Sequence, residues 1–342
     1  MAGERIEYLD QMRAVAIVMV VCIHAVGYVP AMSPLQLDWV LFWVLPIAVP
    51  VFFFVDGFLL SMQLDAKPVA YGPYIRKSAV RLLIPWVLFL IFYAVARYVL
   101  EMVGFLSAHL VLGQEPQQVA ARVYMSVYAP QMYFLLSLFL IRAALPLVRR
   151  LFHDASLLLS IAATIALIVF YNTVDVEALL PFHSLLAMEG QEPVLHAIFG
   201  LQFFVLGMVM SRLRTQTDFR RWVLPVALLF VASSVMKVTL PGNHWWTAFF
   251  YLILFFVLFS EFSRESRLLR IVGQNTMGIY LLHTPIVLRF VSMVVALVIA
   301  EPMAAFLVTV LGVMVVSLAL SLFVTRVPYG GMLFGIPRSV RA

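Results

Sequence analysis

The chain has 342 residues, of which 64% are hydrophobic and only 12% are charged. An ordinary soluble domain carries about a quarter charged residues, so this composition excludes a water-soluble globular protein. A membrane-spanning helix needs about 20 mostly apolar residues, and such stretches recur from near residue 12 to near residue 326. The alternating pattern of a membrane β-barrel is absent, which leaves helices as the spanning elements. We therefore predict an all-α fold, with one polytopic integral membrane domain over residues 1–342.

Apolar stretches and the residues that interrupt them predict about ten transmembrane helices. These lie near residues 12–30, 39–61, 82–103, 131–148, 155–171, 194–211, 222–238, 245–262, 273–298 and 303–325. If the N-terminus is cytoplasmic, 18 of the 23 basic residues fall on the cytoplasmic side, as the positive-inside rule requires. Ten spans then place both termini in the cytoplasm. The formal charge is +6, and the basic residues lie where they orient the helices and meet anionic lipid or phosphate. We therefore expect no nucleic-acid partner.

The first predicted span carries the most informative polar residues. Ionisable groups within spans are costly and face the bundle interior or a water-filled cavity. Arg13 and His24 are 11 residues apart, which is three helical turns to within about 20° and about 16 Å along the axis. Asp10 precedes Arg13 by one turn and can orient it. His24 is then either a proton acceptor at mid-membrane depth or a buried histidine that bonds a backbone carbonyl.

Two further ionisable residues are expected near that stripe. His283 lies about ten residues into the ninth span and should match His24 in depth; it is either a structural partner or a substrate ligand. Asp56 lies near the cytoplasmic end of the second span. A buried carboxylate needs a partner, so we expect an ion pair with Arg13 or Arg142, whether as a structural lock or as part of the site.

Basic and aromatic residues at the ends of later spans allow two interpretations each. Three basic residues precede or open the third span, namely Arg76, Lys77 and Arg81. They either anchor the topology or bind phosphate groups, and one guanidinium group can bond two phosphate oxygens at once. Tyr133 opens the fourth span and is either an aromatic-belt residue or a site residue.

Two long outer loops are expected after the third and fifth spans. Arg97 and Glu101, four residues apart near the outer end of the third span, should pair before a loop near 104–130 that holds a short helix near 116–128. A second loop near 172–193 is acidic and has no Lys or Arg. That charge reflects either topology alone or the binding of an acceptor substrate.

Several segments together resemble the acyltransferase-3 family of bacterial membrane O-acyltransferases. They are Leu9-Asp10-x-x-Arg13 followed after ten residues by His24, the segment 50–58 around Asp56-Gly57, Arg76 to Pro85-Trp86, Met132-Tyr133-Phe134 and Gly278-Ile-Tyr280-Leu-Leu-His283. The resemblance covers essentially the whole chain. Asp56 stands where the family usually has a small residue, which leaves the identity of the substrate open. Ala14 stands where the family more often has glycine.

The resemblance implies transfer of an acyl group, commonly acetyl from acetyl-CoA, to a hydroxyl of a sugar or other envelope acceptor in the bacterial inner membrane. Arg13 and His24 match the family's activity motif, and Arg76 and Arg81 match arginines thought to meet the CoA phosphates. We expect an acyl-CoA donor and a glycan acceptor as partners, no tightly bound cofactor and no metal. His24 acts as general base or carries the acyl group, with Arg13 guiding the donor.

Two other function classes fit part of the pattern. A transporter or flippase for a lipid-linked glycan could use the same polar stripe as a proton relay, and a membrane sensor without chemistry is a weaker rival. No Walker loop, Gly-x-Ser-x-Gly elbow or His-Glu-x-x-His motif occurs in the sequence, so nothing supports ATP-driven transport or zinc hydrolysis. Binding of a CoA thioester and release of free CoA would distinguish the transferase from both rivals.

Overall fold

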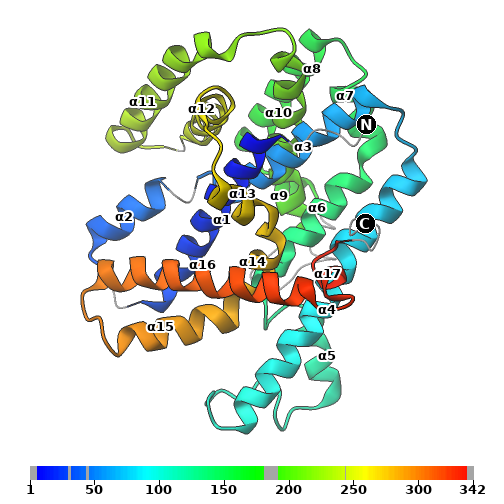
Figure 1. Ribbon diagram of the computed structural model, residues 1–342. Coiled ribbons are helices and arrows are strands. Elements are labelled where there is room, and N and C mark those ends of the chain that lie inside the picture. The colour runs from blue at the N-terminus through cyan, green and yellow to red at the C-terminus, as the bar shows by residue number, and fades with distance from the viewer. Residues whose placement is uncertain (1–5, 30–31, 44–45, 181–191, 243, 337–342) are drawn as a thin grey trace. The chain divides into compact units, whose positions relative to one another are not determined.

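A computed structural model describes residues 6–29, 32–43, 46–180, 192–242 and 244–336, and all regular structure within these ranges is helical (Figure 1). The chain forms two compact units, Met1–Ala66 with Phe203–Leu322, and Lys67–Gln202 with Phe323–Ala342. The all-α fold class is therefore confirmed for the described residues.

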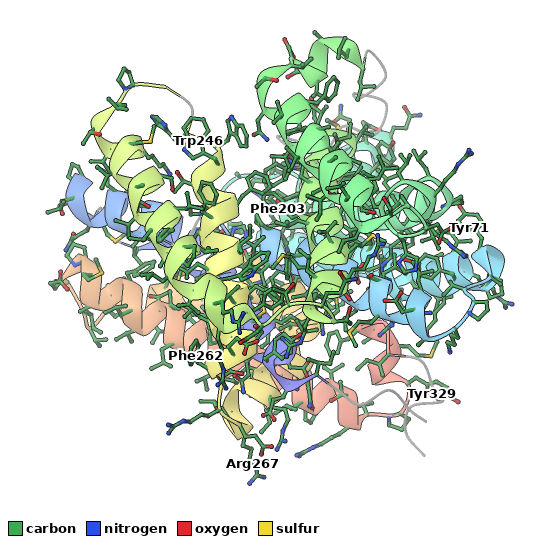
Figure 2. All side chains as sticks on the ribbon, turned by 90° about the horizontal axis from the view of Figure 1, so that it is seen from above. Tyr71, Phe203, Trp246, Phe262, Arg267 and Tyr329 are labelled. Atoms are coloured by element: carbon green, nitrogen blue, oxygen red, sulfur yellow. The ribbon has the colours of Figure 1, made fainter. Side chains whose placement is uncertain are left out.

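The first unit is built around α1. Its helices are α1 (Glu7–Ala25), η1 (Val26–Tyr28), α2 (Pro34–Trp43), α3 (Pro50–Ala66), η4 (Phe219–Trp222), α11 (Val223–Thr239), α12 (Trp246–Phe262), α13 (Arg267–Gln274), α14 (Thr276–Leu282), η5 (His283–Val287), α15 (Leu288–Ala296) and most of α16 (Pro302–Arg326). α1 packs against α3, α12, α13 and α14. Figure 2 labels the two ends of α12, Trp246 and Phe262.

The second unit contains the longest helix of the described chain. Its helices are α4 (Tyr71–Met102), α5 (Pro116–Tyr124), η2 (Pro130–Met132), α6 (Tyr133–Ala143), α7 (Leu145–Phe152), α8 (Leu157–Thr173), α9 (Val176–Leu179) and α17 (Gly330–Leu333). α10 (Pro193–Arg214) begins in this unit and continues into the first from Phe203. The 32 residues of α4 span about 48 Å, which exceeds a hydrocarbon core of about 30 Å.

Six of the described helical segments are long and apolar enough to cross a membrane. They are Glu7–Tyr28, Tyr71–Met102, Pro193–Arg214, Phe219–Thr239, Thr276–Ala296 and Pro302–Arg326. A seventh is obtained if Pro130–Ala143 and Leu145–Phe152, which meet at a bend of 63°, form one broken span. The protein is an integral membrane protein, while the count of ten spans and the cytoplasmic termini stay predictions.

Three expected spans are interrupted, each beside a proline. The span expected at 39–61 is divided, because α2 ends at Trp43 and α3 begins only at Pro50. The span expected at 131–148 bends between α6 and α7, where Pro146 opens the second helix. The span expected at 273–298 contains the π-helical turn η5 around Pro285. Proline has no N–H and disfavours a helical residue before it, which explains all three breaks.

Two glycines let α3 and α10 approach backbone to backbone within the first unit. A Cβ on Gly57 would lie 1.9 Å from the carbonyl oxygen of Phe204, and one on Gly207 would lie 2.0 Å from that of Phe54. Small residues at membrane helix contacts commonly allow such close approach. A third contact of this kind joins α13 to α1, where a Cβ on Gly273 would lie 2.0 Å from the Asp10 carbonyl oxygen.

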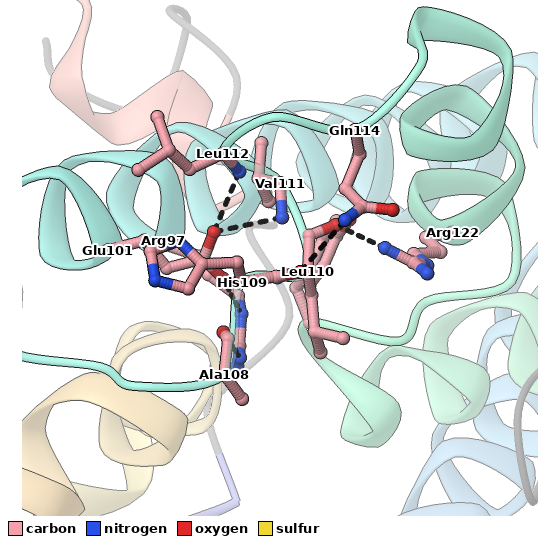
Figure 3. A network of polar contacts seen from close by, with 10 residues as sticks. Arg97, Glu101, Ala108, His109, Leu110, Val111, Leu112, Gln114 and Arg122 are labelled. Atoms are coloured by element: carbon pink, nitrogen blue, oxygen red, sulfur yellow. Dashed lines mark hydrogen bonds and ion pairs between the residues drawn. The ribbon is translucent and has the colours of Figure 1, made fainter.

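A carboxylate at the end of α4 holds the following loop in place (Figure 3). Glu101 has a fully buried side chain and pairs with Arg97, its Oε1 lying 2.7 Å from Arg97 Nε, as the sequence predicted. Its two carboxylate oxygens also accept backbone N–H groups from Leu110, Val111 and Leu112 at 2.8–2.9 Å. The donors from Arg97 and from residues 110–112 thus tie the loop to the end of α4 through one buried charge.

The outer loops agree in part with expectation. α5 covers Pro116–Tyr124, which is shorter than the helix expected near 116–128. Ser126 follows with a φ of 56°, a left-handed conformation that cannot continue an α-helix. Residues 181–191 of the acidic loop expected near 172–193 lie outside the described ranges.

Candidate active site

α1 carries Asp10, Arg13 and His24 on one uninterrupted helix from Glu7 to Ala25. The helical register assumed for the Arg13–His24 spacing therefore holds. Asp10 Oδ1 accepts a hydrogen bond from Arg13 Nη1 at 3.4 Å. The Asp10 side chain is only 4% exposed and that of Arg13 is 25% exposed, so a nearly buried carboxylate orients a guanidinium group that still reaches the surface.

His24 lies beside His283 in the first unit. The centroids of the two imidazole rings are 5.1 Å apart, with their planes at 49°. His283 is fully buried and His24 is half-buried. The two histidines that the sequence placed at similar depth are therefore neighbours, although they are 259 residues apart in the chain.

The hydrogen bonds of His283 determine which of its nitrogens carries the proton. His283 Nδ1 lies 2.7 Å from the Tyr280 carbonyl oxygen and 3.2 Å from that of Ile279. Both neighbours only accept, so Nδ1 is the protonated nitrogen of the neutral ring and Nε2 keeps its lone pair. Nε2 is buried and has no hydrogen-bond partner among the described residues. An unpaired buried acceptor is unfavourable and suits a donor brought by a ligand or by the neighbouring imidazole.

The break at η5 explains why His283 bonds its own helix. Thr284 has extended dihedral angles, φ −134° and ψ 151°, directly before Pro285. The regular ladder of α14 ends there, because Pro285 has no N–H to give to the turn before it. The imidazole N–H of His283 bonds carbonyls of that last turn instead. π-helical turns within spans are frequent at functional sites.

Asp56 belongs to the same unit as the two histidines. It is half-buried on α3, next to Gly57 and its close contact with α10. Its expected ion pair with Arg13 or Arg142 stays a prediction.

The basic residues expected to hold phosphate lie on the first turns of α4, in the second unit. Arg76, Lys77 and Arg81 are all exposed, whereas Ser78 and Leu82 of the same turns are buried. No ion pair or hydrogen bond involves the side chains of Arg76 and Lys77 within the described ranges. These two cations are therefore available to an anionic ligand.

Tyr133 has a neighbour that the sequence analysis missed. Its ring lies 4.2 Å from that of His196, centroid to centroid, with an angle of 36° between the planes. Ser137 on α6 donates to the Pro193 carbonyl at 2.9 Å and joins the two helices close by. The only available signal was position, since Tyr133 and His196 both lie at the outer ends of their expected spans. No group of three His, Cys, Asp or Glu residues among those described could hold a metal ion.

Comparison with known proteins identifies the family. A model of the acyltransferase-3 family, described as an acyltransferase domain, matches residues 6–326. The chain belongs to this family. Both histidines and all the basic residues of α4 lie within the matched range. Membership makes the protein a membrane acyltransferase in general terms. No match was found among curated proteins or among solved structures.

Proposed function

We propose that this acyltransferase-3 protein moves an acyl group from acyl-CoA to a hydroxyl of a cell-envelope glycan, with acetyl as the first candidate. The observation that carries the proposal is the pair of neighbouring imidazoles, His24 and His283, with a buried lone pair on His283. An imidazole with a pKa near 6.5 can take a proton from a hydroxyl near neutral pH. No metal is needed for this chemistry.

In the proposed reaction His24 acts as the general base. It takes the proton of the acceptor hydroxyl while the hydroxyl oxygen attacks the thioester carbonyl carbon. The carbon–sulfur bond then breaks, and the His24 imidazolium gives the proton to the CoA thiolate. The products are the ester and free CoA thiol. His283 supports this cycle by offering Nε2 as a hydrogen-bond acceptor to the His24 ring or to the acceptor hydroxyl. Transfer through an acyl-His24 intermediate is the alternative route.

The phosphate groups of acyl-CoA are charged and require binding residues that are exposed to water. Arg76 and Lys77 are exposed cations without ion-pair partners in the described part of the chain, and Arg81 is exposed on the same stretch of α4. We assign the CoA phosphates to these three residues, because guanidinium and ammonium groups bind phosphate strongly. Arg13, held by Asp10, would guide the pantetheine arm or the thioester carbonyl toward His24.

The proposed topology has ten spans with both termini in the cytoplasm of a bacterium. Six described segments meet the length and hydropathy of a span, and the bent pair α6–α7 is a seventh. α8 and α12 are apolar helices of 17 residues each, which is the lower end of the usual range for a span. These two helices would be the eighth and ninth spans, and α2 and α3 together would form the tenth.

A donor turnover assay tests the proposal. Purified protein in detergent is incubated with acetyl-CoA, and release of the free thiol is followed with and without a glycan acceptor. We expect His24→Ala to lower turnover by about 10²- to 10⁴-fold, the usual share of a general base. Arg76→Ala should raise the donor KM about tenfold, because a hydrogen bond to a charged group contributes about 1.5 kcal/mol or more.

Two matched variants serve as controls. His109→Ala removes an exposed histidine of the outer loop, and Arg150→Ala removes an exposed arginine that is also expected on the cytoplasmic side. Both should behave like the unchanged protein. Full turnover by the His24→Ala protein would refute the assigned role of His24. Absence of both thiol release and saturable acyl-CoA binding in the unchanged protein would refute the donor assignment.

A further inference from the structure

Two buried hydrogen-bond donors in the first unit have no partner among the described residues. They are the hydroxyl of Tyr8, in the first turn of α1, and Nη1 of Arg214, the last residue of α10. Buried polar groups are nearly always hydrogen-bonded, and each exception calls for an explanation such as an absent ion. Two such groups on neighbouring side chains therefore indicate a bound ligand more strongly than either group alone.

Packing holds both groups in place. The Arg214 guanidinium carbon lies 4.6 Å from the centroid of the Tyr8 ring, above its face. The ring itself meets Phe58 at 6.4 Å and Phe256 at 6.1 Å, centroid to centroid, in both cases nearly edge to face. A cation above an aromatic face is attracted by the ring, but this contact uses no N–H donor. Packing thus holds the two donors in place, although no acceptor among the described residues bonds them.

The surrounding charge favours an anion. The nearby carboxylate of Glu261 is engaged by Arg220, whose Nε lies 3.5 Å from Glu261 Oε2. The segments 212–221 and 261–270, both in this unit, hold seven arginines against three carboxylates. These residues are Arg212, Arg214, Arg220, Arg221, Arg264, Arg267 and Arg270, with Asp218, Glu261 and Glu265. α1 adds Glu7, Asp10 and Arg13, which leaves the excess positive. Such an excess of one sign raises the local concentration of anionic ligands.

We propose that Tyr8 and Arg214 form a binding site for a phosphate group. Arginine has only N–H donors and matches two phosphate oxygens at once, and the Tyr8 hydroxyl supplies a further donor. The phosphate comes either from a soluble phosphate ester or from the headgroup of a membrane phospholipid. The proposal uses none of the basic residues on α4, and it does not depend on the proposed transferase reaction.

Two binding experiments in a phosphate-free detergent distinguish the sources. In the first, calorimetry measures binding of adenosine 3′,5′-bisphosphate, with adenosine as the probe that lacks phosphate. In the second, native mass spectrometry counts adducts of phosphatidylglycerol, with a glucosyl diacylglycerol as the phosphate-free lipid. Each is carried out with the unchanged protein and with Arg214→Gln, Tyr8→Phe and Arg221→Gln. Tyr8→Phe removes only one oxygen and keeps the aromatic packing, so it tests the site even if Arg214→Gln folds poorly.

The expected result is weaker binding of the phosphate-bearing probe in at least one experiment. Arg214→Gln should weaken it about tenfold or more, and Tyr8→Phe about fivefold. The control Arg221→Gln should change little, because that side chain is 86% exposed and lies beside Asp218. Loss in the first experiment identifies a soluble ester as the ligand, loss in the second a lipid, and loss in both a site that accepts either. Unchanged affinities in both experiments, or an equal loss with Arg221→Gln, would overturn the proposal.

Discussion

Glu101 stabilises residues 110–112 of the loop that follows α4, and the size of its contribution follows from its partners. Glu101→Gln keeps the shape of the side chain but removes the charge and turns one acceptor oxygen into a donor. Of the three backbone N–H groups that the carboxylate accepts, at least one then faces another N–H. Hydrogen bonds to charged groups contribute about 1.5–3 kcal/mol each, against about 1 kcal/mol for neutral ones. We expect a loss of about 3 kcal/mol in the local free energy of opening.

Hydrogen exchange measures this quantity directly. A loss of about 3 kcal/mol corresponds to exchange on the order of a hundredfold faster at the amides of residues 110–112, because about 1.4 kcal/mol is a factor of ten. The matched control is Glu115→Gln, which changes an exposed carboxylate in the same loop whose side chain makes no capping hydrogen bond. Exchange should stay unchanged there and in helices of the first unit. Equal exchange rates in the Glu101→Gln variant and the unchanged protein would refute the assigned role of the buried carboxylate.

Three further predictions concern packing, pH and turnover. Gly273→Ala should lower the melting temperature, because its Cβ would meet a backbone carbonyl at 2.0 Å, with a cost of about 1–3 kcal/mol; Gly72→Ala, which has open space around it, should not. Hydrogen bonds from the backbone N–H groups of the first turn of α16 lower the pKa of Glu301. The ionised carboxylate therefore stabilises the fold above the pKa of the unfolded chain, and this stabilisation is lost as pH falls through the pKa of the folded protein. Between about pH 3 and 6, the range set by that carboxyl pKa, the melting temperature should depend less on pH in Glu301→Gln than in the unchanged protein. The same pH dependence in both proteins would contradict this. His283→Asn keeps an N–H donor for the nearby carbonyls but removes Nε2, so kcat should fall by up to about 10²-fold with an unchanged donor KM; unchanged kcat would exclude His283 from the reaction.

The sequence was sufficient for features that depend on neighbours along one helix. The register of Arg13 and His24, the Asp10–Arg13 contact and the Arg97–Glu101 pair all follow from helical spacing, and the structure contains each of them. Hydropathy also located most helices, because a span must satisfy its backbone internally and expose apolar side chains to lipid.

Features that depend on distant segments were harder to predict. The ring contact of Tyr133 with His196 arises from packing between helices, for which one sequence gives no pattern. The same holds for the donors of Tyr8 and Arg214, which have no partner among the described residues. The prolines that divide expected spans were visible, but hydropathy alone could not show whether a helix would bend, as at Pro146, or stop, as before Pro50. Tertiary context decides between these outcomes.

The reciprocal glycine contacts between α3 and α10 also fix the direction in which Asp56 points. Each glycine meets a backbone carbonyl of the other helix, so no flexible side chain between them can absorb a rotation of α3 about its axis. Asp56 adjoins Gly57 and is therefore held about 100° around the helix from that contact. A substitution at position 56 therefore changes which side chain is presented in that direction. Turning α3 about its axis would instead require the two backbones to separate.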